Sequence, residues 1–255
     1  MRKLSLLFSS PTVIQEREFQ RSQIAAKRDW YFQTNPLDRI QFDPAYKHKI
    51  DLIKTHLGRP KGVILDIGGN VAGEAIVLQQ LGLNFLVGDI NEIALGISRE
   101  RCKRFKLTKP RYVALDVHNI PVQEGSCSAV TVIEALHHFY SYPKALAEIR
   151  RILEPGGKLI SLEPNGLNPI RRLSEIRDRF RGTIEKSFFC AQLKGLCKRA
   201  GFSRVTIQPV SFGKSCYKLD ELSPCRRNIA KMHGWLSQNY PSVFGNLLIE
   251  AYKAE

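Results

Sequence analysis

Three aspartates stand at the ends of three short apolar stretches, and these are the residues whose types and spacing could do chemistry. Asp66 follows Val-Ile-Leu, Asp89 ends Phe-Leu-Val-Gly, and Asp116 ends Tyr-Val-Ala-Leu. Each stretch has the length and apolar character of a buried parallel strand. Open α/β sheets bind ligands at the carboxyl edge of their strands. The pattern therefore predicts three carboxylates side by side at a binding site.

A glycine-rich turn follows Asp66 directly. Gly68 and Gly69 interrupt the apolar stretch, and residues 72–81 continue at helical spacing. A strand, a glycine turn and a helix in this order point backbone N–H groups at the polar end of a ligand, and glycine permits a close approach that a Cβ would block. A carboxylate before the turn would repel phosphates and suits a ligand with a positive or hydrogen-donating centre. The alternative role for Asp66 is a helix cap.

Asp89 lies at about the distance beyond this turn at which doubly wound folds place a ribose-binding carboxylate. Its two oxygens could accept both ribose hydroxyls. The turn itself does not meet the spacing of the dinucleotide-binding G-x-G-x-x-G pattern, so the ligand expected here is not a dinucleotide.

The order and spacing of these segments resemble the class I S-adenosylmethionine-dependent methyltransferases, most closely the group with a methyltransferase type 11-like core. That core has a glycine-rich motif, an acid after the second strand, Asp-x-x-x-(Ile/Leu)-Pro, Leu-His-His and Leu-x-Pro-Gly-Gly. The corresponding segments are residues 66–73, Asp89, residues 116–121, 136–138 and 153–157. The resemblance is specific for the fold and the cofactor, and not for the substrate. In one departure, Asn70 and Ala72 stand where the family's second and third glycines belong.

The resemblance implies a site for S-adenosylmethionine. Asp89 would hold the ribose and Asp116 the adenine amino group, while the backbone of the turn would hold the methionine end and Asp66 would orient that turn. Glu134 would lie close to the sulfonium methyl group. The implied cofactor-binding residues are Asp66, Gly68, Gly69, Asn70, Gly73, Asp89, Ile90, Asp116, Val117 and Glu134.

Two adjacent histidines, His137 and His138, follow the expected fourth strand. Histidine is the side chain whose ordinary pKa lets it take a proton near neutral pH, so either could act as a general base. The alternative is a structural role, in which the ring packs and hydrogen-bonds within the following helix.

The expected fold is α/β: a Rossmann-like, seven-stranded, mostly parallel sheet with helices on both faces and an N-terminal helical cap. The 255 residues, 43% of them hydrophobic, suit one domain with appendages. We expect a helical extension over residues 1–60, the methyltransferase domain over 61–255, and substrate-side insertions near 164–186 and 210–243. The aromatic residues 30–32 could form a lid or simply pack on the core.

The formal net charge is +15, and the excess of Lys and Arg concentrates beyond residue 170. An acidic small molecule, a phospholipid surface or RNA would each explain this charge, and so would solvated helix faces. The six cysteines have no metal-ligand spacing, so we expect no metal site. No apolar stretch has the length of a membrane span, and we expect a cytoplasmic protein; the sequence gives no oligomeric state.

Together these features predict an enzyme that transfers the methyl group of S-adenosylmethionine to an oxygen, nitrogen or carbon of a small-molecule or lipid-like acceptor. Two alternatives remain open. One is an RNA methyltransferase that uses the basic insertion, so that nucleic acid is a possible though not favoured partner. The other is a non-catalytic S-adenosylmethionine-binding accessory protein, for which Asn70 and Ala72 argue.

Overall fold

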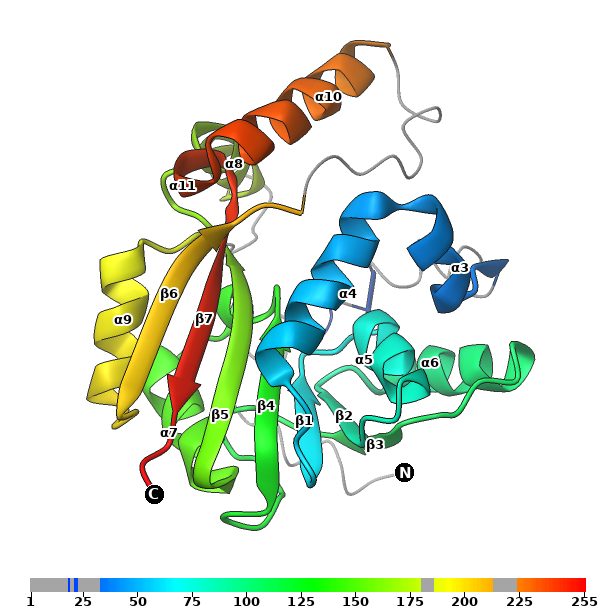
Figure 1. The fold of residues 1–255 in the computed structure, drawn as a ribbon, viewed down its shortest axis with the longest axis vertical. Helices are drawn as coiled ribbons and strands as arrows, with labels where there is room; N and C mark the ends of the chain where they lie inside the picture. The colour runs from blue at the N-terminus through cyan, green and yellow to red at the C-terminus, as the bar shows by residue number, and fades with distance from the viewer. Residues whose placement is uncertain (1–17, 19–20, 23–32, 180–185, 213–223) are drawn as a thin grey trace.

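A seven-stranded sheet forms the centre of the molecule in the computed structural model, which describes residues 18, 21–22, 33–179, 186–212 and 224–255 (Figure 1). Its strand order is β3-β2-β1-β4-β5-β7-β6. The strands are β1 Val63–Ile67, β2 Phe85–Asp89, β3 Arg111–Ala114, β4 Cys127–Ile133, β5 Leu153–Pro164, β6 Arg204–Val210 and β7 Asn246–Tyr252. Strands β1 to β5 pair in parallel, and β7 runs antiparallel to both β5 and β6. This arrangement confirms the predicted Rossmann-like, mostly parallel sheet.

Helices cover both faces of the sheet (Figure 1). They are α3 Pro36–Phe42, α4 Pro44–Leu57, α5 Gly73–Gln80, α6 Glu92–Arg104, the 3₁₀ helix η1 Leu136–His138, α7 Tyr142–Ile152, α8 Pro169–Arg179, α9 Cys190–Arg199, α10 Pro224–Asn239 and α11 Pro241–Phe244. Successive strand residues point to opposite faces, so Leu65 packs in the core with α7 and α9, whereas Ile64 packs in the core with α4 and α5. In the part of the chain that the structure describes, no helix is both long and apolar enough to cross a membrane.

The sequence predicts a helix over residues 46–57 of the N-terminal extension, and the structure forms it as α4, which begins two residues earlier. The side chain of Asp43 caps its first turn, and Gly58 ends it with a φ of 67°. Its buried face includes Ile50, Ile53 and Leu57, which pack on the sheet. The aromatic residues 30–32 lie outside the described residues, and the division of the chain at residue 60 stays a prediction.

Two predicted boundaries were wrong. We expected a turn at residues 155–157 before the fifth strand, but β5 begins at Leu153, which pairs with Cys127 before the register shifts. The turn is therefore an irregularity inside the strand. The helix expected from Phe188 begins at Cys190, because Phe188 instead forms a bridge with Asn165. The expectation that the segment 210–243 is irregular or partly helical is confirmed, because it includes the helices α10 and α11.

Candidate active site

The glycine turn closes over the buried carboxyl group of Asp66 in β1. Thr131 on the neighbouring strand β4 donates a hydrogen bond from Oγ1 to Asp66 Oδ1 at 2.6 Å. A Cβ on Gly69 would lie only 2.5 Å from Asp66 Oδ2 and 2.8 Å from Val87 Cγ1. Burial raises the pKa of Asp66 to about 7; the charges of Glu74 and Asp89 add to this rise, and the Thr131 hydrogen bond opposes it. Glycine is thus required at position 69 because it leaves room for this carboxyl group.

Substitution of Gly69 by alanine is expected to destabilise the protein by roughly 1–3 kcal/mol, because the new methyl group overpacks the space beside Asp66 and Val87. Gly96→Ala is the matched control. A Cβ at Gly96, inside α6, would meet nothing within 4 Å, and alanine in a helix interior should stabilise by about 0.5–1 kcal/mol. Urea unfolding of both variants measures the two effects, and the interpretation fails if they have the same sign.

The turn takes left-handed backbone conformations at Gly68, Asn70 and Ala72, with φ angles of 71°, 49° and 55°. Asparagine tolerates this conformation better than most residues, whereas at Ala72 it costs roughly 1–2 kcal/mol. The positions where the sequence departs from the family's glycines therefore take the backbone conformation that glycine favours. Asn70 Oδ1 is also buried without a hydrogen-bond partner among the described residues.

Asp89, at the end of β2, ties the turn to the start of α6. Its Oδ2 accepts a hydrogen bond from the Asn70 N–H at 2.8 Å, and its Oδ1 accepts one from the Asn91 N–H at 2.7 Å. A carboxylate has about four acceptor positions, so these two bonds do not exhaust its capacity. Ile90 lies between Asp89 and Asn91, the residue that caps α6.

Asp116 is paired with a histidine that the sequence analysis did not single out. Asp116 Oδ1 lies 2.6 Å from His118 Nδ1 and accepts a further bond from the His118 N–H at 2.9 Å. The Ser141 N–H donates to His118 Nε2 at 3.2 Å, which places the ring proton on Nδ1. Burial alone would raise the pKa of Asp116, but the hydrogen bonds from His118 outweigh it and hold that pKa below its ordinary value. The side chain of Val117 packs in the core, so its backbone is the part that could contact a ligand.

Lys49 of the N-terminal extension joins two carboxylates at the same edge of the sheet. Its Nζ lies 2.7 Å from Glu134 Oε2, after β4, and 3.0 Å from Glu74 Oε1, in the first turn of α5. The ammonium group lowers the pKa of Glu134; burial would raise the pKa of Glu74, but the Lys49 charge outweighs it. Glu134 has a φ of 54°, a strained conformation for this residue. The extension thus contributes a charge to the site, and because residues 49 and 134 are far apart in sequence, no local pattern could reveal this.

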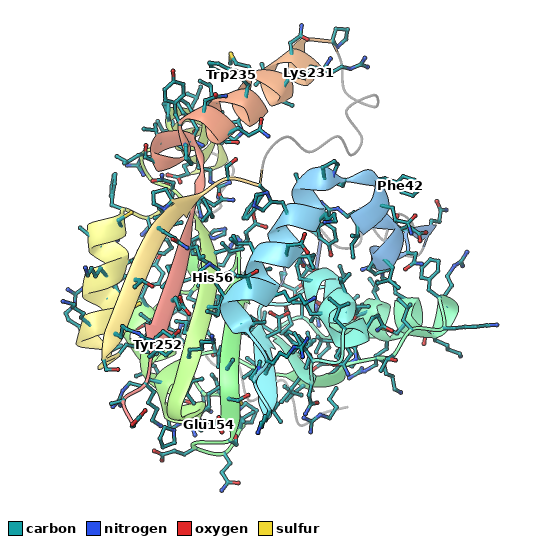
Figure 2. The ribbon with its side chains drawn as sticks, viewed as in Figure 1. Phe42, His56, Glu154, Lys231, Trp235 and Tyr252 are labelled. Carbon is teal, nitrogen blue, oxygen red and sulfur yellow. The ribbon has the colours of Figure 1, made fainter. Side chains whose placement is uncertain are left out.

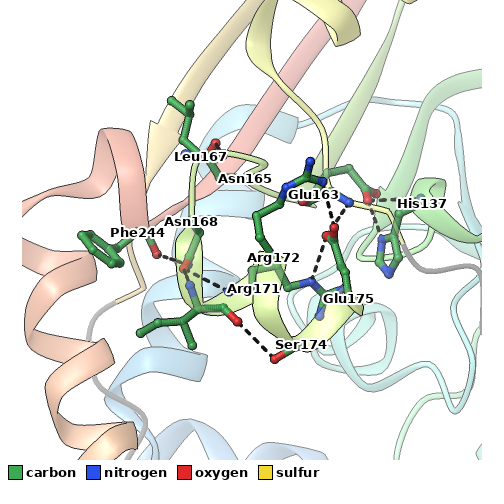
Figure 3. A network of polar contacts seen from close by, with 12 residues as sticks. His137, Glu163, Asn165, Leu167, Asn168, Arg171, Arg172, Ser174, Glu175 and Phe244 are labelled. Carbon is green, nitrogen blue, oxygen red and sulfur yellow. Dashed lines mark hydrogen bonds and ion pairs between the residues drawn. The ribbon is translucent and has the colours of Figure 1, made fainter. Parts of the chain in front are cut away.

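Glu163, at the end of β5, contacts His137, the first histidine of the pair (Figure 3). The Glu163 side chain is fully buried; it accepts hydrogen bonds from the backbone N–H of Leu136 at 2.9 Å and of His137 at 3.3 Å, and its Oε2 lies 2.7 Å from His137 Nδ1. The ring centroids of His137 and His138 are 4.1 Å apart. Burial, followed by the charges of His137 and Arg171, lowers the pKa of His138 to about 3. His138 is therefore neutral at physiological pH, and His137 is held by Glu163.

The basic segment after β5 is anchored beside this pair through α8 (Figure 3). The buried carboxylate of Glu175 accepts a hydrogen bond from the Ser187 N–H at 2.7 Å and pairs with Arg172 Nη1 at 3.0 Å. Arg171 on the same helix lies close enough to His138 to influence its pKa. The basic segment thus borders the edge where the sequence analysis expected a substrate.

The structure brings most of the predicted residues to the carboxyl edge of the sheet. Carboxylates at the ends of β1, β2 and β4 gather around the glycine turn, and close backbone packing at Gly69 leaves space that a Cβ would fill. Such a cluster suits a ligand that carries positive charge and hydroxyl donors. The residues that sequence reasoning missed are Lys49, Glu74, His118, Thr131 and Glu163.

Known proteins that are similar to this chain include methyltransferases. A family model described as a methyltransferase domain matches residues 65–161. The chain is 31% identical to the demethylmenaquinone methyltransferase of Thermus thermophilus over 102 residues, which is 39% of this chain and 46% of that protein. It is 29% identical to the highly reducing polyketide synthase azaB of Aspergillus niger over 144 residues, 50% of this chain and 6% of that protein. The chain thus spans less than half the length of these two relatives.

Among solved structures, the chain is similar to a methyltransferase of Thermotoga maritima described as a possible histamine N-methyltransferase. The two share 17% sequence identity with a TM-score of 0.62, over 92% of this chain and 97% of the other. The strand order and the strand-end carboxylates define a class I methyltransferase fold. Residues 65–161 of the chain thus match a methyltransferase domain, and the chain has the fold of the class I methyltransferases.

Proposed function

We propose that this protein transfers the methyl group of S-adenosylmethionine to an oxygen, nitrogen or carbon of a small-molecule or lipid-like acceptor. The observation that supports this most is the gathering of carboxylates around a glycine turn at the carboxyl edge of the sheet. A relative named for demethylmenaquinone also supports an organic molecule as the acceptor. The cytoplasmic location expected from the sequence stays a prediction.

The proposed cofactor site uses the residues that the sequence analysis assigned. Asp89 with Ile90 would hold the ribose, and Asp116 with the backbone of Val117 would hold the adenine. The turn would hold the methionine end, aided by Glu134; its residues in this role are Asp66, Gly68, Gly69, Asn70 and Gly73. When bound, the cofactor supplies a methyl group already activated on a positively charged sulfur.

Because the methyl group arrives activated, the protein's own residues chiefly position the acceptor and exclude water. His138 stays the first candidate for a general base and His137 the second. A histidine with a pKa of about 3 is a weak proton acceptor. This environment favours an acceptor atom that is nucleophilic before it loses a proton, such as a neutral amine or an activated carbon, over an unactivated hydroxyl.

The test is calorimetric titration with S-adenosylmethionine and S-adenosylhomocysteine. The Asp89→Ala variant is expected to lose about tenfold to a hundredfold in affinity, because two hydroxyl donors would lose a charged acceptor. Asp51→Ala on α4, where the carboxylate is 57% exposed and paired with Lys47, is the matched control and should bind like the wild type.

Failure of the wild type to bind either compound would contradict the proposal. Binding that survives Asp89→Ala unchanged would contradict the assigned ribose contact. Tight binding without methyl transfer to any acceptor in a screen would favour the accessory-protein alternative. Salt-sensitive RNA binding coupled to RNA methylation would favour the other alternative.

A further inference from the structure

Helix α10 turns small and polar side chains toward the body of the protein. Ser237 is buried, and its hydroxyl lies 3.1 Å from the hydroxyl of Ser211, just after β6. His233 is half-buried, with Nε2 lying 3.0 Å from Nδ2 of Asn168, just before α8. Among the described side chains of α10, these polar contacts hold the inner side of the helix.

The outer side of α10 carries the large apolar side chains. Ile229, Met232 and Trp235 recur every third residue, and they are 47%, 52% and 55% exposed. Figure 2 shows Trp235 and Lys231 on α10 at the margin of the molecule, away from the sheet. A surface helix ordinarily buries its apolar side chains and exposes its polar ones. Here the pattern is inverted, which marks the outer side as an interaction surface.

The charge of α10 indicates what it would contact. The helix sequence contains Arg226, Arg227 and Lys231 and has no aspartate or glutamate. Of these cations, Lys231 is exposed, and a second copy of this chain docked on the same face would bring the two lysines together, which is unfavourable. An anionic surface complements both the charge and the apolar side chains.

The neighbouring helix α8 also exposes apolar side chains together with a basic one. Leu173 and Ile176 are 69% and 53% exposed, and Arg172 also lies at the surface. Asn168 connects the two helices, because it caps the start of α8 and contacts His233 of α10.

We propose that the outer face of α10, formed by Ile229, Lys231, Met232 and Trp235, docks on the surface of an anionic phospholipid bilayer. An interfacial helix inserts apolar side chains to the depth of the headgroups while cations pair with anionic lipids. Tryptophan is enriched at this depth. The inference goes beyond the proposed function and does not require methyl transfer, so its test is independent of catalysis.

The experiment uses the full chain and vesicles of phosphatidylcholine, either alone or with roughly one-third phosphatidylglycerol, the anionic component. In a Trp30→Phe background, Trp235 is the single tryptophan. Its fluorescence should be quenched by brominated phosphatidylcholine in the anionic vesicles and not in the neutral ones. Co-sedimentation should show at least tenfold weaker binding for the double variant Met232→Ser/Trp235→Ser, and about fivefold weaker binding for Lys231→Glu.

The matched control is the double variant Leu81→Ser/Ile93→Ser, which removes two side chains of similar exposure, 53% and 49%, from the residue that follows α5 and from α6. It should bind within twofold of the wild type. The proposal is overturned if anionic vesicles do not bind the protein, or if both double variants bind equally. It is also overturned if analytical ultracentrifugation shows a dimer that Met232→Ser/Trp235→Ser dissociates, because the face would then be covered by a second copy.

Discussion

Glu163→Ala is expected to reduce the free energy of unfolding by roughly 3–5 kcal/mol, because it removes the acceptor shared by several buried hydrogen-bond donors. The Glu163 carboxylate accepts from the backbone N–H groups of Leu136 and His137 and lies 2.7 Å from His137 Nδ1. The Leu136 N–H, among these donors, would be left buried without its acceptor, and an unsatisfied donor costs about 1–3 kcal/mol. Without the Glu163 carboxylate, the 3₁₀ helix η1, which positions His138, would also lose its anchor.

Urea unfolding at neutral pH measures this loss. Glu154→Ala is the matched control, since Glu154 lies in the same strand at its exposed beginning, and its effect should stay within about 0.5 kcal/mol. Glu163→Gln keeps an acceptor oxygen without the charge. Its loss in free energy of unfolding should lie between the losses for Glu163→Ala and Glu154→Ala. A loss for Glu163→Ala that does not exceed that of Glu154→Ala by at least about 1 kcal/mol would show that the donors find other partners.

The strand ends were predictable from the sequence because their signals are local. Strand β2 ends at Asp89 as expected, and β1 and β3 end within a residue or two of Asp66 and Asp116. The carboxyl ends of parallel strands lie at one edge of the sheet. The three apolar stretches that end in aspartate therefore indicated a single site. The two glycines of the turn were also predictable, since their role depends on neighbours a few residues away.

The missing parts of the site depend on contacts between distant segments. Lys49 meets Glu134 across the N-terminal extension, and Glu163 meets His137 across two strands. Neither contact can be predicted from a local periodicity or from a fixed spacing in the sequence. His118 was closer to being predictable, because it stands two residues after Asp116 and such a histidine can contact that carboxylate.

The distribution of charge separates two surfaces of this basic chain. The carboxyl edge of the sheet brings together Asp66, Glu74, Asp89 and Glu134 around Lys49, in a protein of net charge +15. The excess positive charge lies instead on segments such as α8 and α10. One surface is thus suited to a positively charged ligand, and the other to an anionic partner. The net charge of the whole chain describes neither surface.

Asp66 should make the protein less stable as the pH rises from about 4 to about 7. Folding raises the pKa of Asp66 from its ordinary value of 3.8 to about 7, chiefly because of burial. In this range the unfolded chain has released the proton, whereas the folded protein still holds it. The folded state binds more protons, so the free energy of unfolding falls with pH, by up to about 1.4 kcal/mol per pH unit. Above pH 7 both states are ionised and the effect levels off.

Asp66→Asn cannot ionise and should abolish this dependence. Asparagine keeps an oxygen that can accept the Thr131 hydrogen bond. The free energy of unfolding of Asp66→Asn minus that of the wild type should therefore increase between pH 4 and pH 7.5, by on the order of 3–4 kcal/mol. Other carboxyl groups of the site, such as Glu134, have lowered pKa values and act in the opposite direction at lower pH, so the difference between the two proteins is the quantity to measure.

Urea unfolding of both proteins at several pH values gives that difference. Asp51→Asn is the matched control, because water solvates the exposed carboxylate of Asp51 in the folded as well as the unfolded protein. A constant difference between Asp66→Asn and the wild type across the range would mean that Asp66 is already ionised at pH 5. Its carboxylate would then be stabilised within the turn despite its burial, and a cationic ligand would not be needed to ionise it. A difference that grows with pH would mean that a positively charged ligand binding beside Asp66 must displace its proton, which predicts proton release on binding near pH 6.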